Sequence, residues 1–143
     1  TYGPRMRLND GRVIPAFIGQ AIRGEDLTVF GDGNQTRSFL FIDECITAIF
    51  KLMESDFIGP VNIGSEEMVT INQLVETAGK ISGKVVRKLY KLDAPTGVRG
   101  RNSNNDLIRE KLGWDYEQTL EEGIRKTYEW ICTQIEEKTD ESI

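Results

Sequence analysis

Helix-like and strand-like apolar patterns alternate along this chain, and glycine or proline separates most of them. The patterns with helical spacing lie at 13–22, 44–54, 70–82, 103–112 and 119–135. Strand-like runs lie at 27–30, 38–42, 61–64 and 85–92. Such a chain buries its apolar faces by packing helices with short strands, so we predict an α/β fold.

Four of the helix starts carry residues that typically cap helices: Asp43, Thr70 with Gln73, Ser103 with Asp106, and Thr119 with Glu122. The predicted helices are also amphipathic. Their apolar faces include Ile46, Ile49, Phe50 and Met53 in the helix at 44–54, and Leu74, Val75, Ala78 and Ile81 in the helix at 70–82.

The composition narrows the possible chemistry. The 143 residues include 18 basic and 23 acidic side chains, a formal charge of −5, and no histidine. The absence of histidine excludes a histidine-based catalytic triad and a histidine-ligated metal, and we predict no metal site. The length and the apolar content of 38% suit one globular domain, which we place at residues 1–135.

Residues 136–143 form a charged tail that we expect to fray. The tail carries a charge of −3, from Glu136, Glu137, Asp140 and Glu141 against Lys138. The rest of the chain is nearly neutral, so no overall field attracts a nucleic acid or an anionic membrane. A phosphate group would have to be held by local arginines.

Cys45 and Cys132 lie 87 positions apart without a CxxC pair, which argues against a zinc site and a disulfide scaffold. We expect two buried thiols in a reducing cytoplasm. No apolar run approaches the roughly 18 residues that a membrane span needs, and no export leader is visible. We therefore expect a soluble, cytoplasmic protein.

The chain opens on Thr1-Tyr2-Gly3-Pro4, a turn signal that normally follows a helix or strand. We therefore expect it to be the C-terminal part of a longer protein. The polar residues that follow, with Arg5, Arg7 and Arg12, form either a substrate-facing loop or a linker.

Two glycine-rich loops carry arginines, one from Gly31 to Arg37 (GDGNQTR) and one from Gly97 to Asn105 (GVRGRNSNN). The arginine guanidinium matches the oxygens of a phosphate, and neighbouring amide and hydroxyl groups can bind a sugar. Two such loops in an acidic protein suggest a clamp for a diphosphate. The alternatives are a plain hairpin turn for the first loop and a solvated loop for the second.

The sequence contains no self-sufficient active site. No GxGxxG follows a strand, no Tyr-x-x-x-Lys pair is present, and no nucleophile has a base beside it, so we predict no catalytic residue in this chain. The segment 70–82 is similar to the first half of a helix-turn-helix motif. Because a strand-like run follows it in place of a second helix, we predict no binding to nucleic acid.

The chain resembles the extended short-chain dehydrogenase/reductase enzymes that act on nucleotide sugars. The strings GDGNQTRSFLFIDEC (31–45), PVNIGSEEMVTIN (60–72), GVRGRNSNN (97–105) and EKLGW (110–114) are similar to its GDP-mannose 3,5-epimerase branch. The opening TYGPRMRLNDGRV (1–13) is similar to its UDP-glucuronate decarboxylase branch. The resemblance covers almost the whole chain.

The resemblance implies the C-terminal, substrate-binding portion of a Rossmann-type, NAD-dependent nucleotide-sugar epimerase or dehydratase. An N-terminal Rossmann domain would hold NAD and the catalytic pair, so this chain alone should be inactive and the full-length enzyme a homodimer. The resemblance assigns binding of the nucleotide-diphosphate sugar to Gln35, Thr36, Arg37, Arg101 and Arg12. It assigns contact with the cofactor to Thr1 and Arg5.

One position departs from the epimerase branch, which carries an acid/base lysine where this chain has Val13-Ile14-Pro15. Ile14 cannot move a proton. This argues against 3,5-epimerisation. Oxidation at C4 by NAD, followed by 4-epimerisation, dehydration or decarboxylation, is compatible with the sequence, as are guanine and uracil nucleotides. A stand-alone, non-catalytic nucleotide-sugar binding or assembly module is the alternative from a different class. Without the upstream domain, an exposed apolar face would favour self-association.

Overall fold

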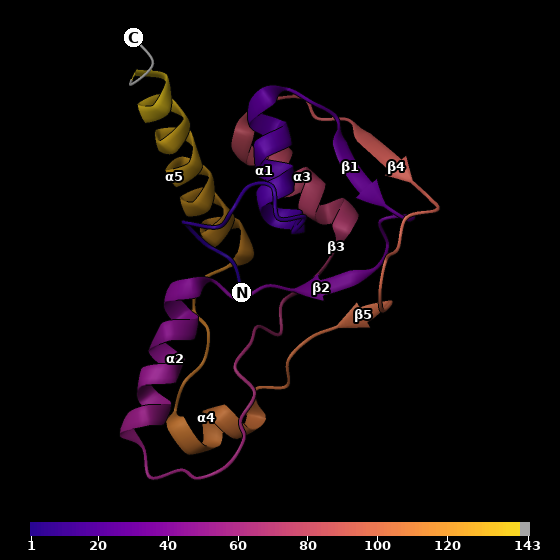
Figure 1. The fold of residues 1–143 in the computed structure, drawn as a ribbon. Coiled ribbons are helices and arrows are strands. Elements are labelled where there is room, and N and C mark those ends of the chain that lie inside the picture. Colours follow the sequence, from indigo (N-terminus) through magenta and orange to yellow (C-terminus); the bar gives the residue numbers. More distant parts are fainter. Residues whose placement is uncertain (141–143) are drawn as a thin grey trace.

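This computed structural model describes residues 1–140, which contain ten helices and strands joined by loops (Figure 1). Their order confirms the predicted α/β mixture of helices and short strands. They are α1 (Val13–Arg23), β1 (Leu27–Phe30), β2 (Thr36–Ser38), α2 (Ile42–Glu54), β3 (Met68–Thr70), α3 (Ile71–Ser82), β4 (Lys88–Lys91), β5 (Gly100–Arg101), α4 (Asp106–Leu112) and α5 (Leu120–Asp140).

The strands form two small sheets. β1 and β4 pair in parallel, with Leu27 opposite Lys88 and Phe30 opposite Lys91. β2 is the central strand of the other sheet, antiparallel to β3 and parallel to β5. In Figure 1 this second sheet lies between the group of α1, α3 and α5 and the pair of α2 and α4.

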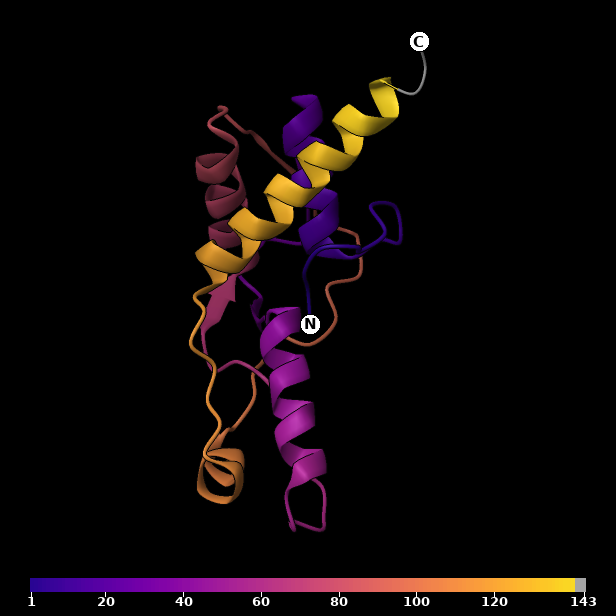
Figure 2. The ribbon, with the colours of Figure 1, turned by 90° about the vertical axis from the view of Figure 1, so that its left-hand side faces the viewer.

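The main core lies where α1, α3 and α5 pack on one another, with α5 running obliquely past the other two helices (Figure 2). Ile18, Leu74 and Ile124 are almost completely buried there. Burying a side chain of this size contributes roughly 1.5–3 kcal/mol. The predicted apolar faces of the three helices supply most of the core, namely Ile14, Phe17, Ile18, Ala21, Leu74, Val75, Ala78, Leu120, Ile124 and Ile131.

A second, smaller cluster joins α2 to α4 through the buried residues Leu40, Ala48, Ile108 and Trp114. Arg109 of α4 supports this cluster from outside. Its guanidinium donates to both carboxylate oxygens of Glu66, at 3.1 and 2.6 Å, and to Asp115 at 2.8 Å. The two bonds to Glu66 tie α4 to the loop before β3, and they lower the pKa of Glu66.

Tyr2 anchors the opening segment to the rest of the fold. Its N–H donates to the Leu40 carbonyl at 3.0 Å, and its carbonyl accepts from the Ile42 N–H at 2.8 Å. The phenol is buried and donates to the Leu120 carbonyl at 3.2 Å. Burial raises the pKa of Tyr2 well above its ordinary value. The predicted opening turn is therefore joined to the starts of both α2 and α5.

Both predicted capping boxes are present. Thr70 Oγ1 accepts from the Gln73 N–H at 3.0 Å, and Gln73 Oε1 accepts from the Thr70 N–H at 2.8 Å. Thr119 and Glu122 bond each other in the same way at the start of α5.

The other two predicted caps are wrong. α2 begins at Ile42, so Asp43 lies inside its first turn instead of preceding it. The residue before α4 is Asn105, and its side chain makes no capping bond to the helix. Ser103 donates to the Asn105 side chain at 2.7 Å, so it serves the loop and not the helix start.

Three of the four predicted strands have a counterpart in the structure, two of them with other bounds. β1 matches its prediction, whereas β2 overlaps the predicted range 38–42 only at Ser38, and Phe41 instead bridges to Tyr2. No strand forms at 61–64, where Val61 and Ile63 pack on the second cluster instead. β4 is shorter than predicted, and β3 and β5 were not predicted.

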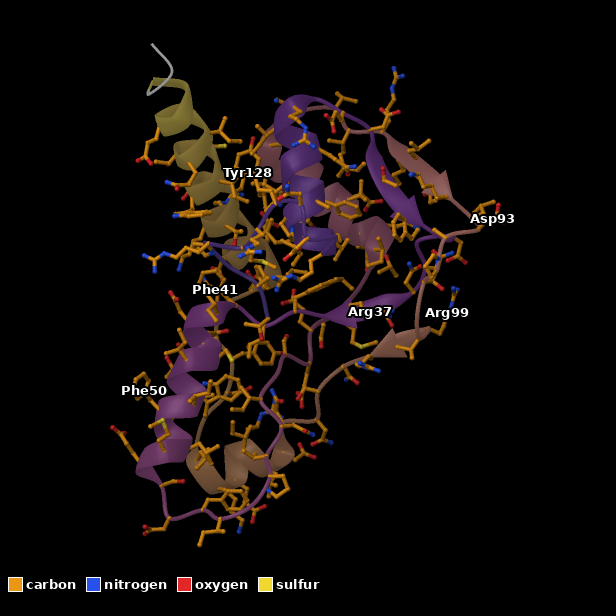
Figure 3. All side chains as sticks on the ribbon, viewed as in Figure 1. Arg37, Phe41, Phe50, Asp93, Arg99 and Tyr128 are labelled. Carbon is orange, nitrogen blue, oxygen red and sulfur yellow. The ribbon has the colours of Figure 1, made fainter. Side chains whose placement is uncertain are left out.

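The apolar face of α2 points away from both clusters. Ile46, Ile49, Phe50 and Met53 are 43–73% exposed, while Ala48 is the buried residue of this helix. Phe50 projects outward from α2 in Figure 3. The periodicity therefore identified the apolar face correctly, but no described residue covers most of it.

The two cysteines are free and half-buried, which corrects the expectation of fully buried thiols. Cys45 lies on α2 and packs against the second cluster, but α2 is too exposed to enclose it. Cys132 lies on α5.

α5 continues through residues 136–140, five residues beyond the predicted end of the domain. The predicted tail therefore begins as helix, and its last residues, 141–143, lie outside the described part of the chain. Neither α5 nor any other helix within the described residues is long and apolar enough to cross a membrane.

The capping box at the start of α3 gives a stability prediction. Thr70→Ala should lower the free energy of unfolding by about 1 kcal/mol, because the Gln73 N–H loses its acceptor. Urea denaturation followed by circular dichroism measures this change. Thr77→Ala is the matched control, since Thr77 lies inside the same helix and bonds only the Gln73 carbonyl. An equal loss in both variants would contradict the capping role.

The open face of α2 gives an association prediction. Phe50→Lys should lower concentration-dependent self-association of the chain, because it removes the most bulky exposed side chain of that face. Light scattering after size exclusion at several concentrations measures this effect. Thr47→Lys adds the same charge to an exposed polar position of α2 and should change association less. A wild-type chain that stays monomeric at all concentrations would refute the prediction.

Candidate functional site

A cavity of about 390 Å³ opens between the start of α1, β1 and the loop that follows β4. This volume lies within the range of small-molecule sites. Its apolar wall is formed by Val13, Ala16, Phe17, Phe30, Ile71 and Pro95. Gln35 and Arg37 of the first arginine loop also line it, whereas no residue of the second arginine loop does.

Gln35 lines the cavity and has one buried polar atom without a partner among the residues that the structure describes. The residue is 5% exposed, and its Nε2 donates to the Phe30 carbonyl at 2.8 Å. Its Oε1 is buried and accepts no hydrogen bond from any residue in the described part of the chain. Leaving a buried acceptor unsatisfied costs about 1–3 kcal/mol. Gln35 therefore keeps a buried acceptor beside the cavity for which the described chain offers no partner.

The pairing of β2 with β5 joins the two arginine loops. Thr36 lies opposite Gly100, and Arg37 lies opposite Arg101. The Thr36 N–H donates to the Arg99 carbonyl at 2.9 Å. The structure thus brings Arg37 and Arg101 together on neighbouring strands, as a clamp formed by the two loops requires.

The guanidinium of Arg37 lines the cavity and is held by backbone carbonyls. It donates to the Thr36 carbonyl at 2.7 Å and to the Thr96 carbonyl at 2.9 Å. Both acceptors are neutral, and an anionic oxygen is a stronger acceptor for the same donor. Arg37 can therefore exchange a carbonyl for a phosphate oxygen without leaving the site. The side chain of Arg101 is exposed.

An ion pair links the same two loops. Arg99 Nη1 lies 3.1 and 3.3 Å from the two carboxylate oxygens of Asp32. The Asn34 N–H also donates to Asp32, at 2.9 Å. The hydrogen bond from the Asn34 N–H lowers the pKa of Asp32 most, and the bond from Arg99 lowers it further. Figure 3 shows Arg99 close to Arg37, beside the connection from β4 to β5.

The other predicted site residues lie around the opening of the chain. Arg12 precedes α1 and pairs with Asp10 at 2.5 Å, while its neighbours Gly11 and Val13 line the cavity. Thr1 and Arg5 are exposed and do not line the cavity. The roles of Arg12, Thr1 and Arg5 in binding stay predictions.

The chain alone does not form a cradle for a dinucleotide. β1 leads into Gly31-Asp32-Gly33, but the turn continues into β2, where a dinucleotide-binding unit has a helix. The residues present therefore do not fit NAD by themselves. Within residues 1–140, no group of three or more Cys, Asp or Glu side chains could hold a metal ion.

Sequence reasoning missed the apolar wall and Lys91, which also lines the cavity. Phe17 was expected only in the helix core, and Lys91 lies at the end of a strand whose partner was unknown. Their positions next to the arginine loops could have indicated some of these wall residues. Phe30 directly precedes the first arginine loop, and Pro95 and Thr96 directly precede the second.

The fold is shared with a segment of solved sugar-nucleotide epimerases. The UDP-glucose 4-epimerase of Thermotoga maritima, solved with UDP-glucose, superposes with a TM-score of 0.89 and 31% identity over 94% of this chain and 44% of that one. The UDP-glucuronic acid 4-epimerase of Bacillus cereus, solved with UDP-glucuronic acid and NAD, superposes with a TM-score of 0.85 and 30% identity. This match covers 93% of this chain and 43% of that one. The class is therefore the extended short-chain dehydrogenases/reductases, in their C-terminal portion.

Sequence relatives agree with this class. Residues 1–64 match the NAD dependent epimerase/dehydratase family. The chain is 46% identical over 140 residues to the GDP-mannose 3,5-epimerase of Arabidopsis thaliana, covering 96% of this chain and 37% of that protein. It is 40% identical over 124 residues to UDP-glucuronic acid decarboxylase 5 of the same plant, covering 87% of this chain and 36% of that protein. The likenesses identify the chain as part of an extended short-chain dehydrogenase/reductase related to these enzymes, and it spans little more than a third of their length.

The ion pair between the loops gives a titration prediction. Asp32 should have a pKa below its ordinary value, because the Asn34 N–H and Arg99 favour the carboxylate. Since the folded-state pKa is the lower one, this contribution to stability is present above the unfolded-state pKa and is lost as the pH falls through the folded-state pKa. Arg99→Ala should raise the Asp32 midpoint partway, because the Asn34 bond remains.

Carbon-13 NMR of the Asp32 carboxyl group during a pH titration measures this midpoint. Arg101→Ala removes an arginine from the same loop that does not contact Asp32, and it should leave the midpoint unchanged. An Asp32 midpoint that does not move in Arg99→Ala would show that the ion pair is absent in solution.

Proposed function

We propose that residues 1–135 form the nucleotide-sugar-binding part of an NAD-dependent epimerase or dehydratase, with the nucleoside diphosphate in the cavity described above. The observation that carries this proposal is the pairing of β2 with β5, which sets Arg37 opposite Arg101. Gln35 directly precedes β2, and its buried oxygen lacks a partner among the described residues.

In this proposal the two arginines bind the diphosphate. A guanidinium offers several N–H donors in a fixed plane, which suits two oxygens of one phosphate group. Thr36 adds a hydroxyl group beside Arg37, and Arg12 lies between Gly11 and Val13, which line the cavity. The net charge of −5 gives no general attraction for anions, so affinity depends on these local donors.

Gln35 and the apolar wall bind the base. Guanine and uracil both carry a ring N–H, which donates to Gln35 Oε1 once that buried oxygen turns toward the cavity and so removes the cost of leaving it unpaired. The Phe30 ring lines the cavity and is 45% exposed, so it offers an apolar surface to a planar base. The sugar then extends toward the part of the longer protein that is outside this chain.

The chemistry on the sugar belongs to that other part. When bound, NAD supplies a reversible hydride acceptor. The described residues do not form its cradle, and the buried Ile14 has no group that could move a proton. The role of this chain is therefore to bind and orient the substrate, with Thr1 and Arg5 available to contact the cofactor. We extend the proposal to a cytoplasmic homodimer for the full-length enzyme, as the resemblance implies.

The clamp gives a binding prediction. Arg37→Ala and Arg101→Ala should each weaken binding of UDP-glucose or GDP-mannose by about 1.5–3 kcal/mol, because each removes a charge-assisted hydrogen bond. Isothermal titration calorimetry on residues 1–143 measures this loss. Arg125→Ala removes an exposed arginine of α5 and should leave the affinity unchanged. The chain with NAD and either sugar nucleotide should show no conversion.

Wild-type affinity in both Arg37→Ala and Arg101→Ala would refute the clamp. A wild-type chain that binds neither sugar nucleotide would refute the proposed function itself. Conversion of either substrate by the isolated chain would refute the assignment of the chemistry to the rest of the longer protein.

A further inference from the structure

Asn72, the second residue of α3, binds the turn that leads into Gln35 and Arg37. Its backbone N–H donates to the Gly33 carbonyl at 3.0 Å. Its side-chain Nδ2 donates to the Asp32 carbonyl at 3.1 Å and to Asn34 Oδ1 at 3.2 Å. One residue therefore bonds three consecutive residues of the first arginine loop.

Tyr90 fixes the orientation of the Asn72 amide group. Its hydroxyl donates to Asn72 Oδ1 at 3.0 Å. Because the amide oxygen accepts this bond, the amide nitrogen faces the turn and donates to it. Tyr90 lies on β4, and the next residue, Lys91, lines the cavity. The wall of the cavity and the turn are thus connected through Asn72.

The turn fits closely against the start of α3. Gly33 has a φ of 74°, a conformation that favours glycine, and a Cβ atom there would lie 2.6 Å from Asn72 Cγ. The Ile71 N–H donates to the Gln35 carbonyl at 3.2 Å. The first N–H groups of α3, which have no partner inside the helix, therefore bond the turn instead.

We propose that Asn72 is a positioning residue of the candidate site, and that it holds the turn at residues 32–34 so that Gln35 and Arg37 face the ligand. The inference rests on the proposed function of the cavity. Asn72 does not line the cavity, so its effect on a ligand passes through the turn. Binding groups that are already held in place lose less conformational freedom when the ligand arrives.

The first test compares two variants at the same helix start. Asn72→Ala should weaken binding of uridine or guanosine diphosphate about tenfold in isothermal titration calorimetry, since 1.4 kcal/mol corresponds to a factor of ten. Gln73→Ala is the matched control, because it removes the bond from the Thr70 N–H to the Gln73 side chain at the same helix start and leaves the turn untouched. It should lower Tm by a comparable amount and leave the affinity unchanged.

Wild-type affinity in Asn72→Ala would overturn the positioning role. Equal weakening by Asn72→Ala and Gln73→Ala would also overturn it, because the effect would then follow the stability of the helix start.

A second test asks whether Asn72 acts through the arginine. In the Arg37→Ala background, the further effect of Asn72→Ala on affinity should shrink, because one of the groups that it positions is absent. Losses that add in full would show that Asn72 acts independently of Arg37, and would overturn the proposal.

A third test needs no ligand and separates this inference from the proposed function. Hydrogen exchange at the Asn34 and Thr36 amides should be faster in Asn72→Ala than in the wild type or in Gln73→Ala. Unchanged exchange would overturn the positioning role even where the wild type binds the diphosphates. Faster exchange in a chain whose wild type binds neither diphosphate would refute the proposed function, and with it a ligand role for Asn72.

Discussion

The candidate site depends on the two-sided pairing of β2. A strand of three residues has little stability of its own, and β2 is held because β3 pairs along one edge and β5 along the other. Thr70 connects this sheet to the core, since it lies opposite Thr36 in β3 and also caps α3. α3 packs on α1 and α5 in the main core. The backbone position of Arg37 therefore depends on the helix core as well as on the loop that contains it.

The sequence predicted those features whose cause is local. Pro15 lies in the first turn of α1 and Gly24 follows its last residue. The Thr70–Gln73 and Thr119–Glu122 pairs mark helix starts because both partners lie within one turn. β3 and β5 could not be predicted in this way. Each has two or three residues, too few to show a periodicity, and each forms only because β2 is available as a partner. The strand predicted at 61–64 failed for the converse reason, since an apolar run without a pairing partner packed on the second cluster.

The site was predicted in its residue types but not in its arrangement. The guanidinium chemistry indicated the two arginine loops, whereas their meeting at Arg37 and Arg101 follows from the strand register. The buried oxygen of Gln35 and the turn contacts of Asn72 are invisible in the sequence, because both arise from contacts between separate segments. The face of α2 shows a related limit. Periodicity identified Ile46 and Phe50 as one apolar face, but burial also requires an element that covers it.

Arg37 can bind a ligand without loss of the connection between the two loops. Its guanidinium donates to the carbonyls of Thr36 and Thr96, so it is held at the cavity wall before any anion arrives. Exchange of the Thr96 carbonyl for a phosphate oxygen replaces a neutral acceptor with a charged one, and such bonds are about twice as strong. The Asp32–Arg99 pair and the Thr36–Arg99 backbone bond do not involve this guanidinium, so they persist after the exchange. In the proposed complex the second loop therefore stays beside the first, and Arg101 remains opposite Arg37.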